Sequence, residues 1–264
     1  MIAKKQDSII TVTHLVNQIG SQIIHENISF SINKGEIIAI IGASGCGKTT
    51  LMRCMLMLHK PVSGSIRIFG IDITHCSTKQ ALQVQHRWGV MFQNMALFSS
   101  LTVWENVIFP IRQFSLLKGE IQKELAMMKI RSVGLHPQDA IKYPSQLSGG
   151  MAKRAALARA IVLDPELVFL DEPSSGLDPV SARAFDKLIV SLRNTLGITF
   201  VIITHDVDTL YRTTDRVMFL GEGKILDFSP IQELVKNPHP LIQNYFQGTD
   251  VSSDETLIGK EDGY

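Results

Sequence analysis

The sequence predicts an α/β fold in which a parallel sheet carries one inserted helical subdomain. Short, continuous apolar runs at residues 36–41, 167–170 and 200–203 are typical of strands that are buried on both faces, as in a parallel sheet. The first run leads into a glycine-rich turn and then a helix, and the later runs alternate with helices. Between them, residues 101–130 are rich in Glu, Lys, Leu and Met, which favour helix.

The remaining elements are predicted from hydrophobic periodicity and turn residues. The predicted strands cover residues 8–12, 27–32, 36–41, 64–69, 89–92, 167–170, 200–203, 217–220 and 224–228, and the predicted helices cover residues 48–58, 101–130, 151–163 and 180–196. No linker is long enough to divide two independent domains. We therefore expect one domain over residues 1–248, with the helical subdomain at about 95–160, and an acidic, flexible tail at 249–264.

Composition and charge exclude several classes of protein. Lys and Arg number 26 and Asp and Glu number 25, so the net charge of +1 gives no electrostatic case for a nucleic-acid partner. No stretch of 18 apolar residues is present and the start has no long apolar segment, so we expect a soluble, cytoplasmic protein without a secretory signal. The cysteines, Cys46, Cys54 and Cys76, have neither metal-like nor disulfide spacing and indicate a reducing compartment.

A complete phosphate-binding loop lies between the strand at 36–41 and the helix at 48–58. Residues 42–49 match the pattern G-x-x-x-x-G-K-[ST] at every fixed position. Lys48 is expected to reach the β- and γ-phosphates, Thr49 to bind Mg²⁺ and Thr50 to donate to the α-phosphate. A glycine-rich turn that binds nothing is the competing interpretation, which the flanking strand and helix disfavour. The predicted ATP-binding residues of this loop are Gly42, Ala43, Ser44, Gly45, Cys46, Gly47, Lys48, Thr49 and Thr50.

Two carboxylates follow the predicted strand at 167–170. Asp171 is expected at the carboxyl edge of the sheet, where the metal ion of a bound nucleotide would lie. Glu172 is placed to polarise a water for in-line attack on the γ-phosphate. A solvated strand end is the ordinary interpretation of such a pair, and the phosphate loop shifts the balance toward catalysis.

A second helix start also suits anion binding. Leu147, Ser148, Gly149 and Gly150 precede the predicted helix at 151–163, with Ser148 as a typical N-cap residue and two glycines that leave the backbone N–H groups approachable. The helical subdomain separates this start from the phosphate loop. We therefore expect the two anion sites of one chain to lie too far apart to hold the same phosphate.

Together these motifs resemble the ATP-binding subunits of ABC transporters over nearly all of residues 8–248. The resemblance implies a P-loop NTPase fold with a RecA-like parallel-sheet core and an antiparallel β-subdomain, and an ATPase that uses ATP and Mg²⁺. It implies that Glu172 and His205 are catalytic and that Thr49, Gln93 and Asp171 hold the metal ion. Gln93 also belongs to the implied ATP site.

The resemblance further implies a head-to-tail homodimer around two ATP molecules, attached to transmembrane permease subunits. The signature that would act in trans on the second subunit's ATP is Leu147, Ser148, Gly149, Gly150 and Met151. The residues that resemble the D-loop are Ser175, Gly176, Leu177 and Asp178.

Within this family, Met151 stands at a signature position where Gln is commoner. That residue and the segments at 91–112 and 237–248 resemble the ATPases of the Mla system, which energise phospholipid transport between the inner and outer membranes of Gram-negative bacteria. This resemblance implies a STAS-domain regulatory partner, a Mce-domain lipid-binding partner and a peripheral position on the cytoplasmic side of the bacterial inner membrane. Two alternatives remain: an ATPase for amino-acid or other small-solute import, and a soluble ABC ATPase that does not serve transport.

Two features depart from simple expectation. The family usually stacks an aromatic residue on adenine near the first strands, but residues 16–19 contain none, and we expect Asn17 to take its place. Base stacking is worth roughly 1–3 kcal/mol, so ATP and GTP should support similar turnover. The segment at 95–103 is more apolar than a loop needs, which indicates either core packing or a groove for a permease coupling helix.

Overall fold

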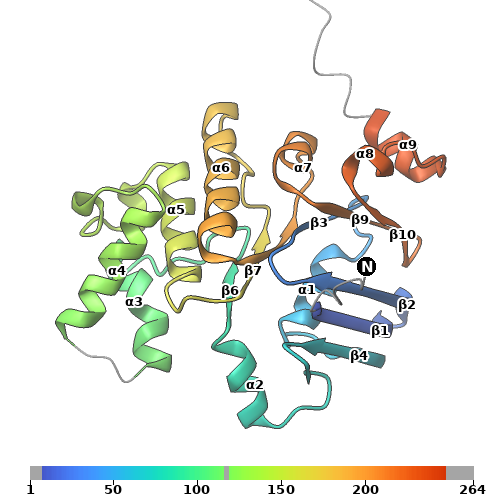
Figure 1. The fold of residues 1–264 in the computed structure, drawn as a ribbon, viewed down its shortest axis with the longest axis horizontal. Coiled ribbons are helices and arrows are strands. Elements are labelled where there is room, and N and C mark those ends of the chain that lie inside the picture. Colours follow the sequence, from blue (N-terminus) through green and yellow to red (C-terminus); the bar gives the residue numbers. More distant parts are fainter. Residues whose placement is uncertain (1–7, 116–118, 248–264) are drawn as a thin grey trace, which may run out of the picture.

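The apolar runs form a six-stranded sheet with the order β10-β9-β3-β8-β7-β6, in a computed structural model that describes residues 8–115 and 119–247. Strands β9, β3, β8, β7 and β6 are mutually parallel, and β10 pairs antiparallel with β9 at one edge (Figure 1). The predicted α/β fold is confirmed. The strands are β3 (Ile37–Ile41), β6 (Trp88–Met91), β7 (Leu167–Asp171), β8 (Thr199–Ile203), β9 (Arg216–Gly221) and β10 (Lys224–Ser229).

A second, antiparallel sheet has the order β2-β1-β4-β5 and lies beside the first (Figure 1). Its strands are β1 (Ser8–Ile19), β2 (Gln22–Asn33), β4 (Ser63–Ile68) and β5 (Ile71–Asp72). Strands β1 and β2 are much longer than the predicted strands at 8–12 and 27–32. The pairing of β1 with β2 shifts register after Val12 and again around Asn17, and these irregularities break the alternation on which the prediction rested.

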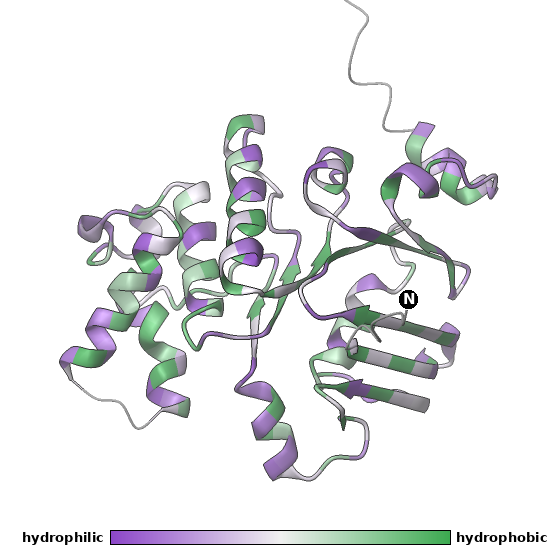
Figure 2. Cartoon of the chain, viewed as in Figure 1, coloured by the Kyte–Doolittle hydropathy of each residue, from purple (hydrophilic) through white to green (hydrophobic). Residues whose placement is uncertain are grey.

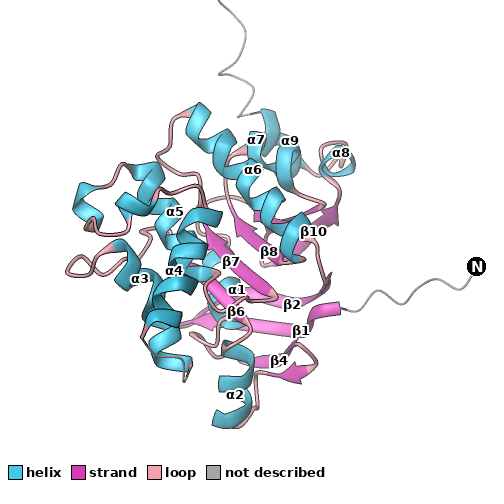
Figure 3. Ribbon diagram, turned by 60° about the vertical axis from the view of Figure 1, so that its left-hand side comes forward, coloured by secondary structure: helices cyan, strands magenta, loops and turns pink. Residues whose placement is uncertain are grey.

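The helices cover both faces of the six-stranded sheet (Figure 3). They are α1 (Lys48–Met55), α2 (Thr78–Gln85), α3 (Val103–Phe114), α4 (Glu120–Ser132), α5 (Gly149–Ala160), α6 (Pro179–Leu196), α7 (Val207–Thr213), α8 (Ile231–Leu234) and α9 (Pro240–Gln247). Two short 3₁₀ turns, η1 (Pro137–Asp139) and η2 (Pro144–Gln146), lead from α4 to α5.

The helical segment predicted at 101–130 is two separate helices. A capping box of Thr102 and Glu105 starts α3, and α4 begins only after residues 116–118, which lie outside the described part of the chain. Helix α2 was not predicted, because Val84 is its one buried residue and its short apolar pattern gives little signal. Its start nevertheless carries a capping box formed by Ser77 and Gln80.

Alternate residues of the buried strands face opposite layers. In β3, Ile38 and Ile40 belong to the core shared with α1 and the antiparallel sheet, whereas Ile37 belongs to the core shared with α3, α4, α5 and α6. Figure 2 shows the same pattern as strongly hydrophobic strands beneath helices whose outer faces are hydrophilic. Helices α1 and α5 therefore pack on opposite faces of the six-stranded sheet.

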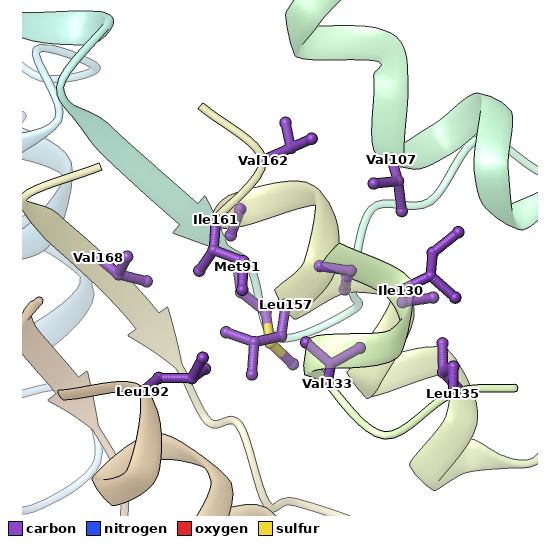
Figure 4. Close-up of a cluster of buried hydrophobic side chains, with 14 of the residues drawn as sticks. Met91, Val107, Ile130, Val133, Leu135, Leu157, Ile161, Val162, Val168 and Leu192 are labelled. Atoms are coloured by element: carbon purple, nitrogen blue, oxygen red, sulfur yellow. The ribbon is translucent and has the colours of Figure 1, made fainter. Parts of the chain in front are cut away.

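The helical subdomain shares its core with the sheet. Leu157 of α5, Ile161 directly after α5 and Ile130 of α4 belong to the same buried cluster as Met91 of β6 and Val168 of β7 (Figure 4). Because this cluster is continuous, the position of α5 is coupled to the strand ends that it contacts. A Cβ on Gly89 of β6 would lie only 2.0 Å from a backbone oxygen of α5, so these two elements are in direct backbone contact.

Two of the predictions concern membrane-spanning segments and the C-terminal tail. Among the described residues, every helix is too short or too polar to cross a lipid bilayer. The acidic tail predicted at 249–264 lies outside the described residues.

The complete burial of β7 leads to a testable prediction about stability. Phe169 is fully buried and packs edge-to-face on Trp88 with 5.9 Å between ring centroids. Phe169→Ala should lower the free energy of unfolding by about 3–5 kcal/mol, because it leaves a cavity in the core. Phe98→Ala is the matched control, since Phe98 is 43% exposed, and it should cost about 1 kcal/mol or less. Denaturant unfolding measures both, and equal losses would contradict this description of the core.

Candidate functional site

The residues of the candidate site follow the carboxyl ends of four parallel strands and lie at one edge of the sheet. The phosphate loop follows β3, His205 follows β8, Glu172 follows β7 and Gln93 follows β6, so the carboxyl ends of adjacent strands bring them to the same side (Figure 1). Gln93 is exposed at this edge. Residues far apart in the chain thus surround the loop that was predicted to bind phosphate.

The phosphate loop turns from β3 into α1, which begins at Lys48. Lys48 Nζ donates to the carbonyl oxygens of Gly42 and Ala43 at 2.7 and 2.9 Å. Cys46 is half-buried, and its Sγ lies 3.9 Å from the same ammonium group. A cavity of about 270 Å³ opens beside the loop and is lined by Ile19, Ile24, Gly45, Gly47, Lys48, Thr49 and Thr50.

Gly47 is required by its conformation and by its surroundings. Its φ of 101° lies in the left-handed region, which disfavours residues with a side chain. A Cβ at this position would also lie 2.4 Å from Nε2 of His25 and 2.6 Å from a methyl group of Ile24. The backbone of the loop therefore rests directly on β2.

The expectation for Asn17 is wrong. Its side chain is fully buried, with Nδ2 at 2.9 Å from Nδ1 of His25, and it accepts a hydrogen bond from the thiol of Cys54. A side chain enclosed in this way has no surface against which a base could stack. Ile19 at the end of β1 is 53% exposed and lines the cavity together with Ile24, so these two apolar side chains stand beside the loop.

Asp171 and Glu172 differ in their surroundings. Asp171 is 8% exposed, and burial raises the pKa of its carboxyl, with a further contribution from the negative charge of Glu172. Glu172 has a φ of 50°, and its N–H donates to the carbonyl of Ile203 on the neighbouring strand. Such backbone strain concentrates at functional sites. Its Oε2 lies 2.9 Å from Nδ1 of His205, a contact whose geometry falls short of a hydrogen bond.

Lys153 is a residue of this site that the sequence analysis did not identify. It lies in α5, is 4% exposed, and its Nζ donates to the carbonyl of Glu172 at 3.2 Å. Burial lowers the pKa of this ammonium group, and the negative charge of Glu172 acts against that effect. The signal in the sequence is a lysine inside an alanine-rich helix whose neighbours are nearly all buried.

The signature segment forms the start of α5. Ser148 is its N-cap and accepts a hydrogen bond from the N–H of Met151 at 3.3 Å, while Leu147 is half-buried just before it. Gly149 and Gly150 stand close to Leu177, whose Cδ2 lies 3.9 and 3.8 Å from the positions their Cβ atoms would take. Because α5 and α1 pack on opposite faces of the sheet, this start does not meet the phosphate loop of the same chain.

The loop after Glu172 leads into α6. The N–H of Ser175 donates to the Glu172 carbonyl at 3.3 Å, and that of Leu177 donates to the Ser174 carbonyl. After Gly176, Asp178 caps α6 by accepting hydrogen bonds from the N–H groups of Val180 and Ser181, and the hydrogen bonds to Ser181 hold its pKa below the usual value. These residues thus have structural roles besides those implied by the D-loop resemblance.

The residues proposed for Mg²⁺ have the right chemistry for that ion. Thr49, Gln93 and Asp171 offer hydroxyl, amide and carboxylate oxygens, which hard divalent cations prefer. Asp171 makes no side-chain hydrogen bond or ion pair within residues 8–115 and 119–247, so its carboxylate is available to a cation. No group of three or more His, Cys, Asp or Glu side chains that could hold a metal ion lies within these residues.

Comparisons with known proteins bear on the family and the fold. A model of the family described as ABC transporter matches residues 25–175. The intermembrane phospholipid transport system ATP-binding protein MlaF of Escherichia coli (strain K12) is 39% identical over 229 residues, which cover 87% of this chain and 85% of MlaF. The methionine import ATP-binding protein MetN of Haemophilus influenzae is 38% identical over 226 residues, which cover 85% of this chain and 65% of MetN.

Among solved structures, the dimeric ATP-binding cassette MJ0796 in a post-hydrolysis state, bound to ADP and Pi, superposes with a TM-score of 0.76. It is 27% identical in sequence and covers 84% of this chain and 98% of that one. The order of sheets and helices seen here is therefore that of a P-loop ATPase cassette.

Buried His25 makes stability depend on pH. Burial lowers its pKa to about 4 from 6.5, partly offset by the Gly47 backbone, and the nearby His59 adds to the lowering. The unfolded chain therefore binds a proton between pH 6.5 and 4 that the folded chain does not, so stability falls as pH falls through this window. Above pH 6.5 the contribution is fully present.

The expected loss from this group is roughly 2–3 kcal/mol between pH 7 and pH 4. Denaturant unfolding across that range should show a steeper decline for the native sequence than for His25→Leu, which has no proton to bind. Parallel curves for the two proteins would contradict the assignment.

Proposed function

This chain belongs to the ABC transporter family, and from that premise we propose that it energises phospholipid transport between the inner and outer membranes of a bacterium. Its relatives make it an ATP-hydrolysing transporter subunit that uses ATP and Mg²⁺. The phospholipid substrate is supported by the 39% identity to MlaF of Escherichia coli over 87% of this chain, and by Met151 and the segments at 91–112 and 237–248, which resemble the ATPases of the Mla system.

The proposed chemistry follows from the edge of the sheet. The N–H groups of the phosphate loop and the ammonium group of Lys48 bind the phosphate tail of ATP. Glu172 accepts the proton of the attacking water, and His205, 2.9 Å from its carboxylate, holds that water and the γ-phosphate in line. Thr49, Gln93 and Asp171 would hold Mg²⁺, which would supply positive charge against the phosphate oxygens.

A second copy completes each site. The family acts as dimers attached to a membrane permease, and the related cassette is itself dimeric. Since α5 and α1 of one chain pack on opposite faces of the sheet, the Ser148 end of α5 is free to close on the phosphate loop of a partner in a head-to-tail arrangement. ATP then stabilises the closed dimer, and its hydrolysis releases it.

An apolar groove offers the surface for the permease. A cavity of about 380 Å³ lies between the sheet and the helical subdomain, beside Gln93, and includes Leu58, Phe92 and Phe114, which are 62%, 38% and 39% exposed. Of the two alternatives for the apolar segment at 95–103, core packing describes most of its apolar residues. Val103 is fully buried, Met95 and Leu97 pack against the core, and Arg159 binds the carbonyls of Met95 and Ala96.

The remaining partners follow from the likeness to MlaF. We propose a STAS-domain regulatory protein on the helical subdomain, a Mce-domain lipid-binding protein across the membrane, and a peripheral position on the cytoplasmic side of the inner membrane.

A methionine-type importer is the second candidate, favoured by the 38% identity to MetN. Affinity purification of the Glu172→Gln protein from detergent-solubilised membranes tests both. Co-purifying permease, Mce-domain protein and phospholipid support the proposal, a solute-binding protein supports the importer, and ATP-dependent dimers without permease support a soluble ATPase.

The role of Glu172 predicts a large effect of one substitution. Glu172→Gln should lower kcat for ATP hydrolysis by about 10²–10⁴-fold, because the amide does not accept the proton of the water. Nucleotide binding should remain, and size-exclusion chromatography with ATP should show an increased dimer fraction. Glu166→Gln is the matched control. Glu166 precedes the first residue of β7, at the opposite end of the strand from Glu172, and forms ion pairs with Lys34 and Arg87. Similar kcat values for the two variants would refute the assignment.

The groove predicts a separation of hydrolysis from transport. Phe114→Asp places a charge in the apolar groove and should abolish co-purification of the permease, while the isolated subunit keeps its ATPase activity within about twofold. Leu196→Asp is the control, because Leu196 at the end of α6 is 47% exposed outside the groove. Normal assembly of the complex with Phe114→Asp would remove the groove as the docking surface.

A further inference from the structure

Three buried polar side chains lie beneath the phosphate loop. Asn17 of β1, His25 of β2 and Cys54 of α1 are 0%, 0% and 2% exposed. We call them the support network. Buried polar groups are costly unless they are hydrogen-bonded, so a cluster of three in an apolar core indicates a function beyond packing.

The direction of every hydrogen bond in the support network can be assigned. Burial raises the pKa of the Cys54 thiol to about 12, so it remains protonated and donates to Asn17 Oδ1 at 3.2 Å. The Asn17 amide then presents Nδ2 to Nδ1 of His25 at 2.9 Å, and since Nδ2 only donates, Nδ1 accepts. A neutral histidine that accepts at Nδ1 carries its proton on Nε2.

The Nε2–H group faces the phosphate loop. It is buried, forms no hydrogen bond of good geometry among the described residues, and lies 2.4 Å from the position a Cβ of Gly47 would occupy. Gly47 immediately precedes Lys48, where α1 begins. The imidazole ring is therefore the surface on which this end of the loop rests.

The support network also links the loop to the apolar wall of the cavity. Ile19 and Ile24 line that cavity together with Gly47 and Lys48. Ile24 is adjacent to His25 in β2, and Ile19 is two residues from Asn17 in β1. Cys54 joins the same network from the helix that starts at the loop.

We propose that His25, oriented by Asn17 and Cys54, is a positioning residue for nucleotide binding, which holds the phosphate loop at a fixed distance from the Ile19–Ile24 wall and thereby sets the affinity for ATP. The ring acts through the backbone of Gly47 and has no part in the hydrolytic step. Loss of its polar contacts weakens binding and leaves the turnover of bound ATP unchanged. This inference rests on the proposed binding of ATP at this loop.

The test separates binding from turnover. In the full chain, His25→Leu keeps the apolar volume and removes both ring nitrogens, and it should raise KM for MgATP about tenfold while kcat stays within about twofold. His25→Gln retains a polar side chain at this position and should raise KM by no more than about threefold. A purely structural role would instead lower kcat and melting temperature together with affinity in both variants.

Two further measurements make the proposal falsifiable. Cys54→Ser keeps a donor to Asn17 and should preserve KM within about threefold, whereas Cys54→Val removes it and should raise KM toward the His25→Leu value. NMR of ¹⁵N-labelled histidine should show His25 neutral and protonated at Nε2. A proton on Nδ1, or an unchanged KM in His25→Leu, overturns the inference.

A loop variant distinguishes failure of this inference from failure of the proposed function. Lys48→Ala should abolish binding of MgATP in equilibrium titrations, because it removes the ammonium group that contacts the phosphates. Unaltered binding by Lys48→Ala would place the nucleotide elsewhere and remove the proposed ATP site itself. Lost binding by Lys48→Ala with native affinity in His25→Leu would remove only the role of the support network.

Discussion

The parallel alignment of β3, β8, β7 and β6 is the constraint on which the site depends. Strands β3, β7 and β8 are mainly apolar and are buried over their whole length, so they must be covered on both faces, and the polar residues that follow them emerge at only one edge. Adjacent strands running in the same direction bring those continuations together. The helices that pack on both faces of the sheet fix the relative positions of the strand ends. The backbone contact between Gly89 and α5 shows how closely a helix packs on the sheet.

Much of this arrangement could be predicted from the sequence, because its signals are local. The phosphate loop is a contiguous motif between an apolar strand and a helix, and the carboxylates of Asp171 and Glu172 directly follow another such strand. Parallel pairing then places both at one edge without further information. The same holds for Ser148, whose role as the N-cap of α5 follows from its residue type and from the helix after it.

Other features depend on contacts between distant segments, and local patterns do not encode them. Asn17 stands in a bulged part of β1, where the alternation of exposed and buried residues is broken, so its burial could not be inferred. Lys153 meets the carbonyl of Glu172 only because α5 packs over β7. The division of the helical subdomain into α3 and α4 was likewise hidden, since helix-favouring residues continue across the boundary.

The contact between Lys153 and Glu172 has a mechanical consequence. Helix α5 carries Ser148 at its first turn and the buried ammonium group of Lys153 one turn later. A displacement of α5 along the sheet therefore either moves the Glu172 carbonyl group with it or breaks the hydrogen bond from Lys153. Breaking that bond is costly, because it leaves a buried ammonium group without an acceptor. The Glu172 backbone is already in a strained conformation, with a φ of 50°. A displacement of its carbonyl group therefore acts on a residue whose backbone conformation is already unfavourable. A movement of α5 relative to β7 is therefore coupled, through this hydrogen bond, to the peptide that follows Glu172.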